Sequence, residues 1–168
     1  MNNIIDLRSD TVTLPSDEMR KTIASSRLGD DVFGEDPCVN KLEQKAALIM
    51  GKEGGLLVPS GTMGNLVSIL VHCQRGTEII LGDKAHTFVF EAGGISAFGG
   101  IHSRQLKNQP DGIIKRSDIQ SAIRVDNVHF PKTSAISLEN THNLCNGSPL
   151  TPMYIRDVSK IARNNNMK

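Results

Sequence analysis

The chain has 168 residues, of which 38% are hydrophobic and 22% charged, and its formal net charge is +1. This length and composition favour one globular domain with a substantial core over a disordered chain. The near-neutral charge and the lack of tryptophan argue against nucleic acid or an anionic membrane as a partner. The three widely spaced cysteines include no CxxC pair and no apolar run reaches membrane-spanning length, which predicts a cytoplasmic protein with reduced thiols.

Two helices are expected near the N-terminus. Ser16 has the residue type and position of an N-cap, because acidic residues follow it in the first turn. A second helix begins at Pro37 and ends near Gly51. Before both helices, residues 6–11 hold five polar side chains, which either form a solvated loop or offer Ser9 to a polar ligand.

A glycine-rich turn separates a short apolar run from a third helix. Residues 56–58 could form a buried strand, and apolar side chains then recur at helical spacing, namely Leu66, Ile69, Leu70 and Cys73. Gly61 lets the backbone approach a bound group, while Ser60 and Thr62 add hydroxyl donors to the free N–H groups of the first turn. Since no lysine follows the glycines, a phosphate monoester fits this turn better than a nucleotide. An ordinary capped turn is the alternative.

The rest of the chain alternates short apolar runs with helices. Strands are expected at residues 78–81, 101–106 and 135–138, and helices at residues 119–123 and from Thr151 onward. The apolar stripe of the last helix consists of Ile155, Val158, Ile161 and Ala162. This alternation predicts an α/β fold with a mainly parallel sheet and helices on both faces. We expect the sheet to be incomplete, because the last helix should lead into another strand; a naturally short domain is the alternative.

Polar side chains follow two of the predicted strands. His86 comes after the first strand, and Glu139 and Asn140 come directly after the third. Open α/β sheets bind ligands at such strand ends, although a lone histidine is more often structural. His129, taken alone, is interpreted as structural. His86 and His142 could be read as a metal pair, but no other residue has ligand spacing, so no metal site is predicted.

Taken together, these stretches resemble the low-specificity L-threonine aldolases, which are pyridoxal-phosphate enzymes with the aspartate-aminotransferase-like fold (fold type I). The matching stretches follow one another over essentially the whole chain, at residues 5–13, 29–34, 59–65, 86–94, 128–131 and 136–143. The resemblance implies that residues 1–168 are the N-terminal part of the large domain that binds pyridoxal 5'-phosphate. Residues 1–50 would form an N-terminal arm with helices, and residues 51–168 the first part of the αβα core.

The resemblance also implies roles for individual residues. The implied cofactor contacts are Ser60, Gly61 and Thr62 at the phosphate, His86 stacked on the pyridine ring, and Glu139 and Asn140 along its face. The implied substrate contacts are Ser9 at the carboxylate and Phe90, which would shape the pocket. His86 and His129 would be catalytic, since both would approach the substrate hydroxyl, from which proton removal starts the cleavage.

The implied reaction is cleavage of L-threonine or L-allo-threonine to glycine and acetaldehyde, with the cofactor as electron sink. The family's cofactor-binding lysine, its acid partner for the ring nitrogen and its carboxylate-binding arginines have no match in this chain. Lys52, Lys84 and Lys168 lie at other positions, and Phe33 stands where relatives often carry tyrosine.

We therefore expect the isolated chain to be inactive and to associate, either as a homo-oligomer (dimer or tetramer) or with a complementing C-terminal fragment. Two other functions stay open. One is a β-eliminating lyase of the same fold, and the other is a non-catalytic fragment that binds a phosphorylated small molecule.

Overall fold

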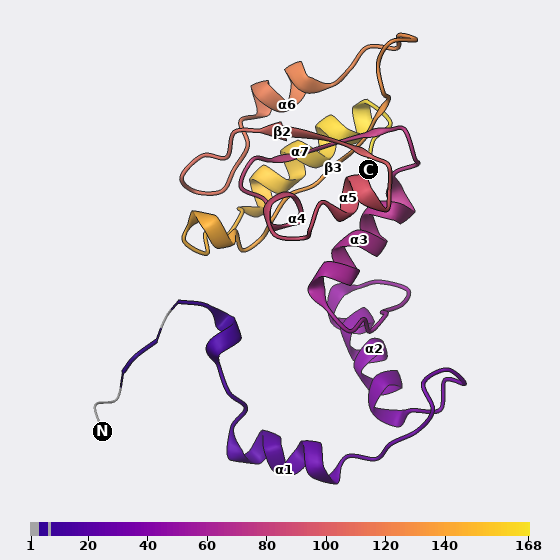
Figure 1. Cartoon of the computed structure of the whole chain (residues 1–168), viewed down its shortest axis with the longest axis vertical. Helices are drawn as coiled ribbons and strands as arrows, with labels where there is room; N and C mark the ends of the chain where they lie inside the picture. The colour runs from indigo at the N-terminus through magenta and orange to yellow at the C-terminus, as the bar shows by residue number, and fades with distance from the viewer. Residues whose placement is uncertain (1–3, 7) are drawn as a thin grey trace. The chain divides into compact units, whose positions relative to one another are not determined.

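A computed structural model describes residues 4–6 and 8–168 of the chain. It divides into two compact units, Met1–Leu57 and Val58–Lys168, which we describe separately (Figure 1). Among the described residues, no helix combines the length and the apolar character that crossing a membrane requires.

The first unit contains the two predicted helices. They are α1 (Asp17–Ser25) and α2 (Pro37–Met50), preceded by a single 3-10 turn, η1 (Asp10–Val12). Ser16 caps α1 by accepting the N–H of Met19, and Asp36 caps α2 in the same way. Helix α2 ends at Gly51, whose φ of 60° is the left-handed conformation that glycine adopts easily. Both helices are therefore confirmed.

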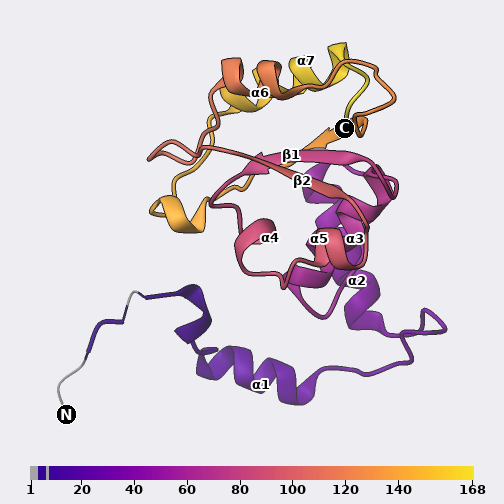
Figure 2. The ribbon, with the colours of Figure 1, turned by 45° about the horizontal axis from the view of Figure 1, so that its top comes forward.

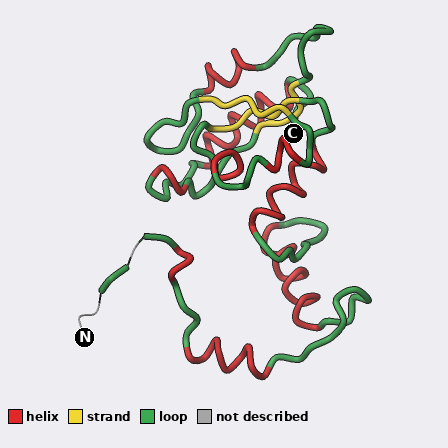
Figure 3. Tube along the Cα trace, viewed as in Figure 1, coloured by secondary structure: helices red, strands yellow, loops and turns green. Residues whose placement is uncertain are grey.

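The second unit is built on a parallel sheet of three strands (Figure 3). The strands are β1 (Glu78–Gly82), β2 (His102–Leu106) and β3 (Thr133–Ile136), in the spatial order β2-β1-β3. Every residue of the central strand β1 is buried, as expected for a strand covered on both faces. The prediction of an α/β fold with a parallel sheet is confirmed.

Helices cover both faces of this sheet (Figure 2). On one face lie α3 (Gly61–His72), α4 (His86–Val89) and α5 (Gly94–Ala97), and on the other α6 (Arg116–Ala122) and α7 (Pro152–Asn164). The first face buries a cluster of Ile69, Cys73, Ile79, Leu81, Ile95, Ile101 and Ala135. The second face buries Ile114, Ile119, Leu150, Tyr154 and Val158.

Several sequence-based expectations differ from the structure. Residues 56–58 form no strand, and Leu56 is 74% exposed, because no neighbouring strand pairs with this short run among the described residues. Strand β3 begins and ends two residues earlier than predicted. In α7 the buried stripe is Tyr154, Val158 and Ala162, whereas Ile155 is exposed. The four-residue helices α4 and α5 were not predicted, since one turn is too short to show a period.

Candidate functional site

The N-terminus of α3 presents unused hydrogen-bond donors. Ser60 is extended, and its Oγ accepts the N–H of Met63 at 3.1 Å, so its hydroxyl proton is still available to a bound oxygen. The N–H groups of Gly61 and Thr62 have no acceptor in the part of the chain that the structure describes. A Cβ built on Gly61 would meet nothing within 4 Å, so the space in front of the turn is open. These groups fit a phosphate or another oxyanion.

His86 is the first residue of α4, which follows β1 after a short turn. Its backbone N–H donates to Oε2 of Glu139 at 2.7 Å, and the other oxygen of this carboxylate accepts the N–H of Asn143 at 2.8 Å. Glu139 follows β3, the strand next to β1. The carboxylate therefore links the polar segments that follow two adjacent strands.

Glu91 orients the side chain of His86. Its Oε1 lies 2.8 Å from Nδ1 of His86 and accepts the side-chain amide of Asn65 at 2.7 Å. The side chain of Glu91 is only 4% exposed, whereas the imidazole is 43% exposed. The ring of Phe90 lies beside the imidazole, with the centroids 5.4 Å apart and a tilt of 50°. With a proton on Nδ1 held by Glu91, Nε2 is the nitrogen left for a ligand.

A cavity of about 300 Å³ lies at this edge of the sheet. It is lined by Asn65, Ala85, His86, Thr87, Ser137, Leu138, Glu139 and Asn140. Asn140 accepts the N–H of Leu150 through Oδ1 at 2.9 Å, which fixes its amide group at the cavity wall. The structure thus brings together three sequence-predicted residues, His86, Glu139 and Asn140. Asn65 also places the first turns of α3 at the same cavity.

His129 does not line this cavity. Ser9 lies in the unit Met1–Leu57, where its Oγ caps η1 by accepting the N–H of Thr11. His129 lies in the loop between α6 and β3. Both ends of this loop are fixed to Glu78, whose carboxylate accepts Nε–H of Arg124 at 2.8 Å and whose N–H donates to the carbonyl of Lys132 at 2.8 Å.

Glu78 begins β1 and His86 follows its end, so the loop that carries His129 and the cavity are at opposite ends of the sheet. In Figures 1 and 2 this loop, drawn in orange after α6, lies beyond the end where the strands begin, and α4 lies toward the end where they finish. The two histidines of one chain are therefore separated by the length of a strand.

Sequence reasoning missed Glu91 and Asn65. The side-chain amide of Asn65 donates to Oε1 of Glu91, but the two residues are 26 positions apart, Asn65 in α3 and Glu91 between α4 and α5. The only local signals are that Asn65 lies one turn after Gly61 and that Glu91 is acidic in an otherwise small and apolar stretch after His86.

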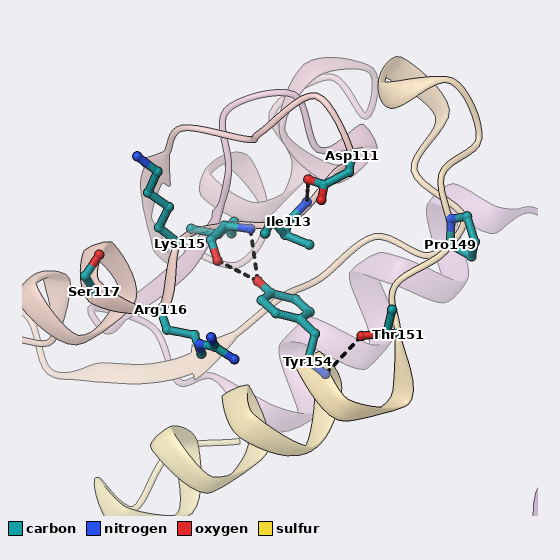
Figure 4. Close-up of a pocket in the computed structure, with 9 residues that line it drawn as sticks. Asp111, Ile113, Lys115, Arg116, Ser117, Pro149, Thr151 and Tyr154 are labelled. Atoms are coloured by element: carbon teal, nitrogen blue, oxygen red, sulfur yellow. Dashed lines mark hydrogen bonds between the residues drawn. The ribbon is translucent and has the colours of Figure 1, made fainter.

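A second cavity, of about 490 Å³, lies between the segment before α6 and the start of α7 (Figure 4). The hydroxyl of Tyr154 donates to the carbonyl of Ile114 at 2.8 Å and accepts its N–H at 2.9 Å. Arg116 pairs with Asp157. These side chains are therefore already satisfied within the chain, and the cavity lies on the sheet face opposite α4.

Comparisons with known proteins give one family model and several sequence relatives. The family model described as Beta-eliminating lyase matches residues 6–168. Low-specificity L-threonine aldolase 1 of Arabidopsis thaliana is 47% identical over 98% of this chain and 47% of its own length. The low specificity L-threonine aldolase of Escherichia coli O157:H7 is 43% identical over 98% of this chain and 48% of its own length. The chain thus spans about half the length of the curated relatives that it matches.

A solved structure has a similar fold. The threonine aldolase of Leishmania major superimposes with a TM-score of 0.56 and 23% sequence identity, over 64% of this chain and 31% of that one. The likeness supports the α/β architecture, and the sequence relatives support the resemblance to the threonine aldolases.

Proposed function

We propose that this chain, which belongs to the beta-eliminating lyase family, supplies the phosphate and ring contacts of a pyridoxal 5'-phosphate site in a threonine aldolase. The reaction would be cleavage of L-threonine or L-allo-threonine to glycine and acetaldehyde. The observation that carries the proposal is the cavity in which Asn65 of α3, His86 of α4 and Glu139 after β3 meet. The threonine aldolases of A. thaliana and E. coli, at 47% and 43% identity, support this choice of substrate.

The first turn of α3 would bind the cofactor phosphate. The N–H groups of Gly61 and Thr62 are unused, and the hydroxyls of Ser60 and Thr62 add donors. The positive end of the helix dipole favours a dianion at this place. The open space in front of Gly61 supports this assignment, because a side chain there would fill the approach to the N–H groups.

His86 would lie over the cofactor ring and handle the substrate proton. The cofactor, when bound, supplies the electron sink for the carbon–carbon bond that breaks. With Nδ1 held by Glu91, Nε2 of His86 would accept the proton of the substrate hydroxyl. The buried carboxylate of Glu91 would then stabilise the imidazolium, as a carboxylate does for a catalytic histidine in hydrolases.

The proposed partner is a second copy of the chain, in a homodimer or homotetramer. His129 and His86 lie at opposite ends of one sheet, so the two could serve one substrate only if they come from different copies. Ser9 would bind the substrate carboxylate and Phe90 would shape the pocket. The three cysteines are free thiols, in keeping with a proposed location in the cytoplasm.

We further propose that residues 1–168 alone do not complete the reaction. No lysine lines the cavity among the residues that the structure describes. The lysine that bonds the cofactor would come from another part of the intact protein or from a complementing chain.

Acetaldehyde release from L-threonine by the intact protein, loaded with pyridoxal phosphate, tests the proposal. We expect release, together with a loss of cofactor affinity in Thr62→Val. The control is Ser68→Ala, because Ser68 lies further along α3 and its hydroxyl bonds only the carbonyl of Gly64. A protein that binds the cofactor but forms pyruvate from β-substituted amino acids instead of acetaldehyde would be a β-eliminating lyase. Unchanged cofactor affinity in Thr62→Val would overturn the phosphate site.

A further inference from the structure

His142 is a buried histidine whose ring nitrogens have no hydrogen-bond partner. The residue is 1% exposed, and neither Nδ1 nor Nε2 has a partner in the described chain. Native proteins rarely leave buried polar atoms unpaired, because desolvation without a replacement bond costs free energy. Packing alone therefore does not explain why a histidine occupies this buried position.

The backbone around His142 confines the ring. The N–H of His142 donates to the carbonyl of Ser148 at 3.0 Å, and its own carbonyl accepts the N–H of Gly147 at 2.9 Å. On the other side lies Gly112, where an added Cβ would come within 2.8 Å of the Cβ of His142. A close packing of this kind leaves the ring only small movements.

The acidic group beside the ring is Glu139. Its Oε1 lies 3.7 Å from Nδ1 of His142, slightly beyond hydrogen-bond distance. The same oxygen accepts the N–H of Asn143, and Oε2 accepts the N–H of His86. A carboxylate oxygen can accept two donors, so Oε1 has capacity for one more.

We propose that His142 is a positioning residue, which donates its Nδ1 proton to Oε1 of Glu139 and so holds this carboxylate under the start of α4. The inference rests on the proposed function, because Glu139 matters there through the backbone of His86. His142 itself does not line the cavity and acts only through Glu139. The donation satisfies one buried nitrogen and gives the carboxylate a third hydrogen bond.

Two substitutions in the intact protein separate positioning from simple packing. His142→Leu replaces the imidazole with an apolar side chain of moderate size and so removes the Nδ1–H donor. His142→Asn places an amide N–H near the position of Nδ1. We expect His142→Leu to lower kcat about 10- to 100-fold, the size of effect seen when groups that orient a ligating residue are removed. His142→Asn should recover most of this loss. The control is His72→Leu, since His72 is exposed at the end of α3.

A purely structural role of His142 predicts the opposite results. If His142 only fills the core, His142→Leu removes two unpaired polar atoms, so it should raise the thermal midpoint and leave kcat unchanged. That pair of results would overturn the proposal.

A measurement without turnover distinguishes this inference from the proposed function. In the ¹⁵N NMR spectrum of the cofactor-free protein, we expect Nδ1 of His142 to carry the proton and its shift to change in Glu139→Gln. If Nδ1 carries no proton, or if its chemical shift is the same in Glu139→Gln, His142 does not position Glu139. If the expected chemical shifts are seen but the intact protein cleaves no threonine, the positioning role of His142 is supported and the proposed function is overturned.

Discussion

The backbone N–H of His86 and the carboxylate of Glu139 are joined by a hydrogen bond of 2.7 Å across 53 residues of sequence. Helix α4 has no side-chain cap of its own, because Ala85 precedes it. The carboxylate from the segment after β3 therefore takes the place of an N-cap and holds the proposed catalytic histidine at the sheet edge.

Glu139→Ala should destabilise the protein at the sheet edge where α4 begins. The substitution leaves the N–H groups of His86 and Asn143 without their acceptor, and we expect it to lower the free energy of unfolding by about 1–3 kcal/mol. Glu139→Gln keeps one acceptor oxygen and should lose less. Chemical denaturation of the intact protein and of both variants measures the difference. Equal stability of the Ala and Gln variants would contradict the capping role.

His86→Ala should remove most of the threonine cleavage. We expect kcat/KM to fall roughly 100- to 10,000-fold, the usual range for loss of a positioned acid–base group. Glu91→Gln keeps an oxygen near Nδ1 but removes the charge that would stabilise the imidazolium, so its loss should be smaller. The measurement is steady-state acetaldehyde release by the intact protein. Near-normal turnover by His86→Ala would refute the assignment.

The parts of the fold that could be predicted from sequence are those set by local signals. Caps at Ser16 and Asp36 begin helices, and the apolar run at β1 forms the buried central strand. Residues 56–58 failed as a strand because strand formation depends on a pairing partner, which local sequence does not specify. For the same reason, the bounds of β3 differ from the predicted residues 135–138.

The site was predictable only where residues follow strand ends. His86, Glu139 and Asn140 meet because the carboxyl ends of parallel strands share one edge. The Glu91 bonds to His86 and Asn65 arise from the tertiary packing of α3 against the segment after β1, so no spacing rule indicates them. The position of His129 at the other end of the sheet follows from its place before β3 rather than after it.

Mixed oligomers test whether two copies share a site. His129→Ala should reduce activity less than His86→Ala, and mainly for substrates with a β-hydroxyl. If His129 acts on the partner's substrate, an oligomer that combines the two variants contains one site with both histidines. In a random mixture of dimers from coexpression, about a quarter of the sites should then carry both histidines, so the activity should exceed the mean of the two single variants. Recovery no greater than the mean of the two single variants would show that both histidines act within one copy.

The buried carboxylate of Glu78 should be a strong stability determinant. It accepts Nε–H of Arg124 at 2.8 Å and the hydroxyl of Thr133 at 3.3 Å, and Arg104 and His102 lie within 3.7 Å. Glu78→Gln leaves the partly buried Arg124 without its counter-charge, and we expect a loss of about 3 kcal/mol in the free energy of unfolding. Arg8→Ala, which breaks the exposed pair with Asp6, is the control and should change nothing measurable. A Glu78→Gln variant as stable as the control would contradict the prediction.

Alkaline pH should destabilise the unit Val58–Lys168 through two buried acids. Burial raises the pKa of the Cys73 thiol above its ordinary 9.0, and burial likewise raises the pKa of the Tyr154 phenol above its ordinary 10.0. The folded protein keeps these protons at a pH where the unfolded chain has already released them. Stability is therefore unaffected below the unfolded pKa values and falls as the pH rises above about 9.

The slope of the unfolding free energy against pH shows which groups cause the decline. Each fully shifted acid contributes up to about 1.4 kcal/mol per pH unit once the unfolded chain has ionised. Denaturation of the intact protein at a series of alkaline pH values should show the decline, and Cys73→Ala should flatten it. Cys38→Ala is the matched control, because this thiol is exposed. If Cys73→Ala and Cys38→Ala have the same slope as the unmodified protein, the buried thiol does not keep its proton, and the packing of Cys73 against Ile69 and Ile79 would not exclude water as the structure indicates.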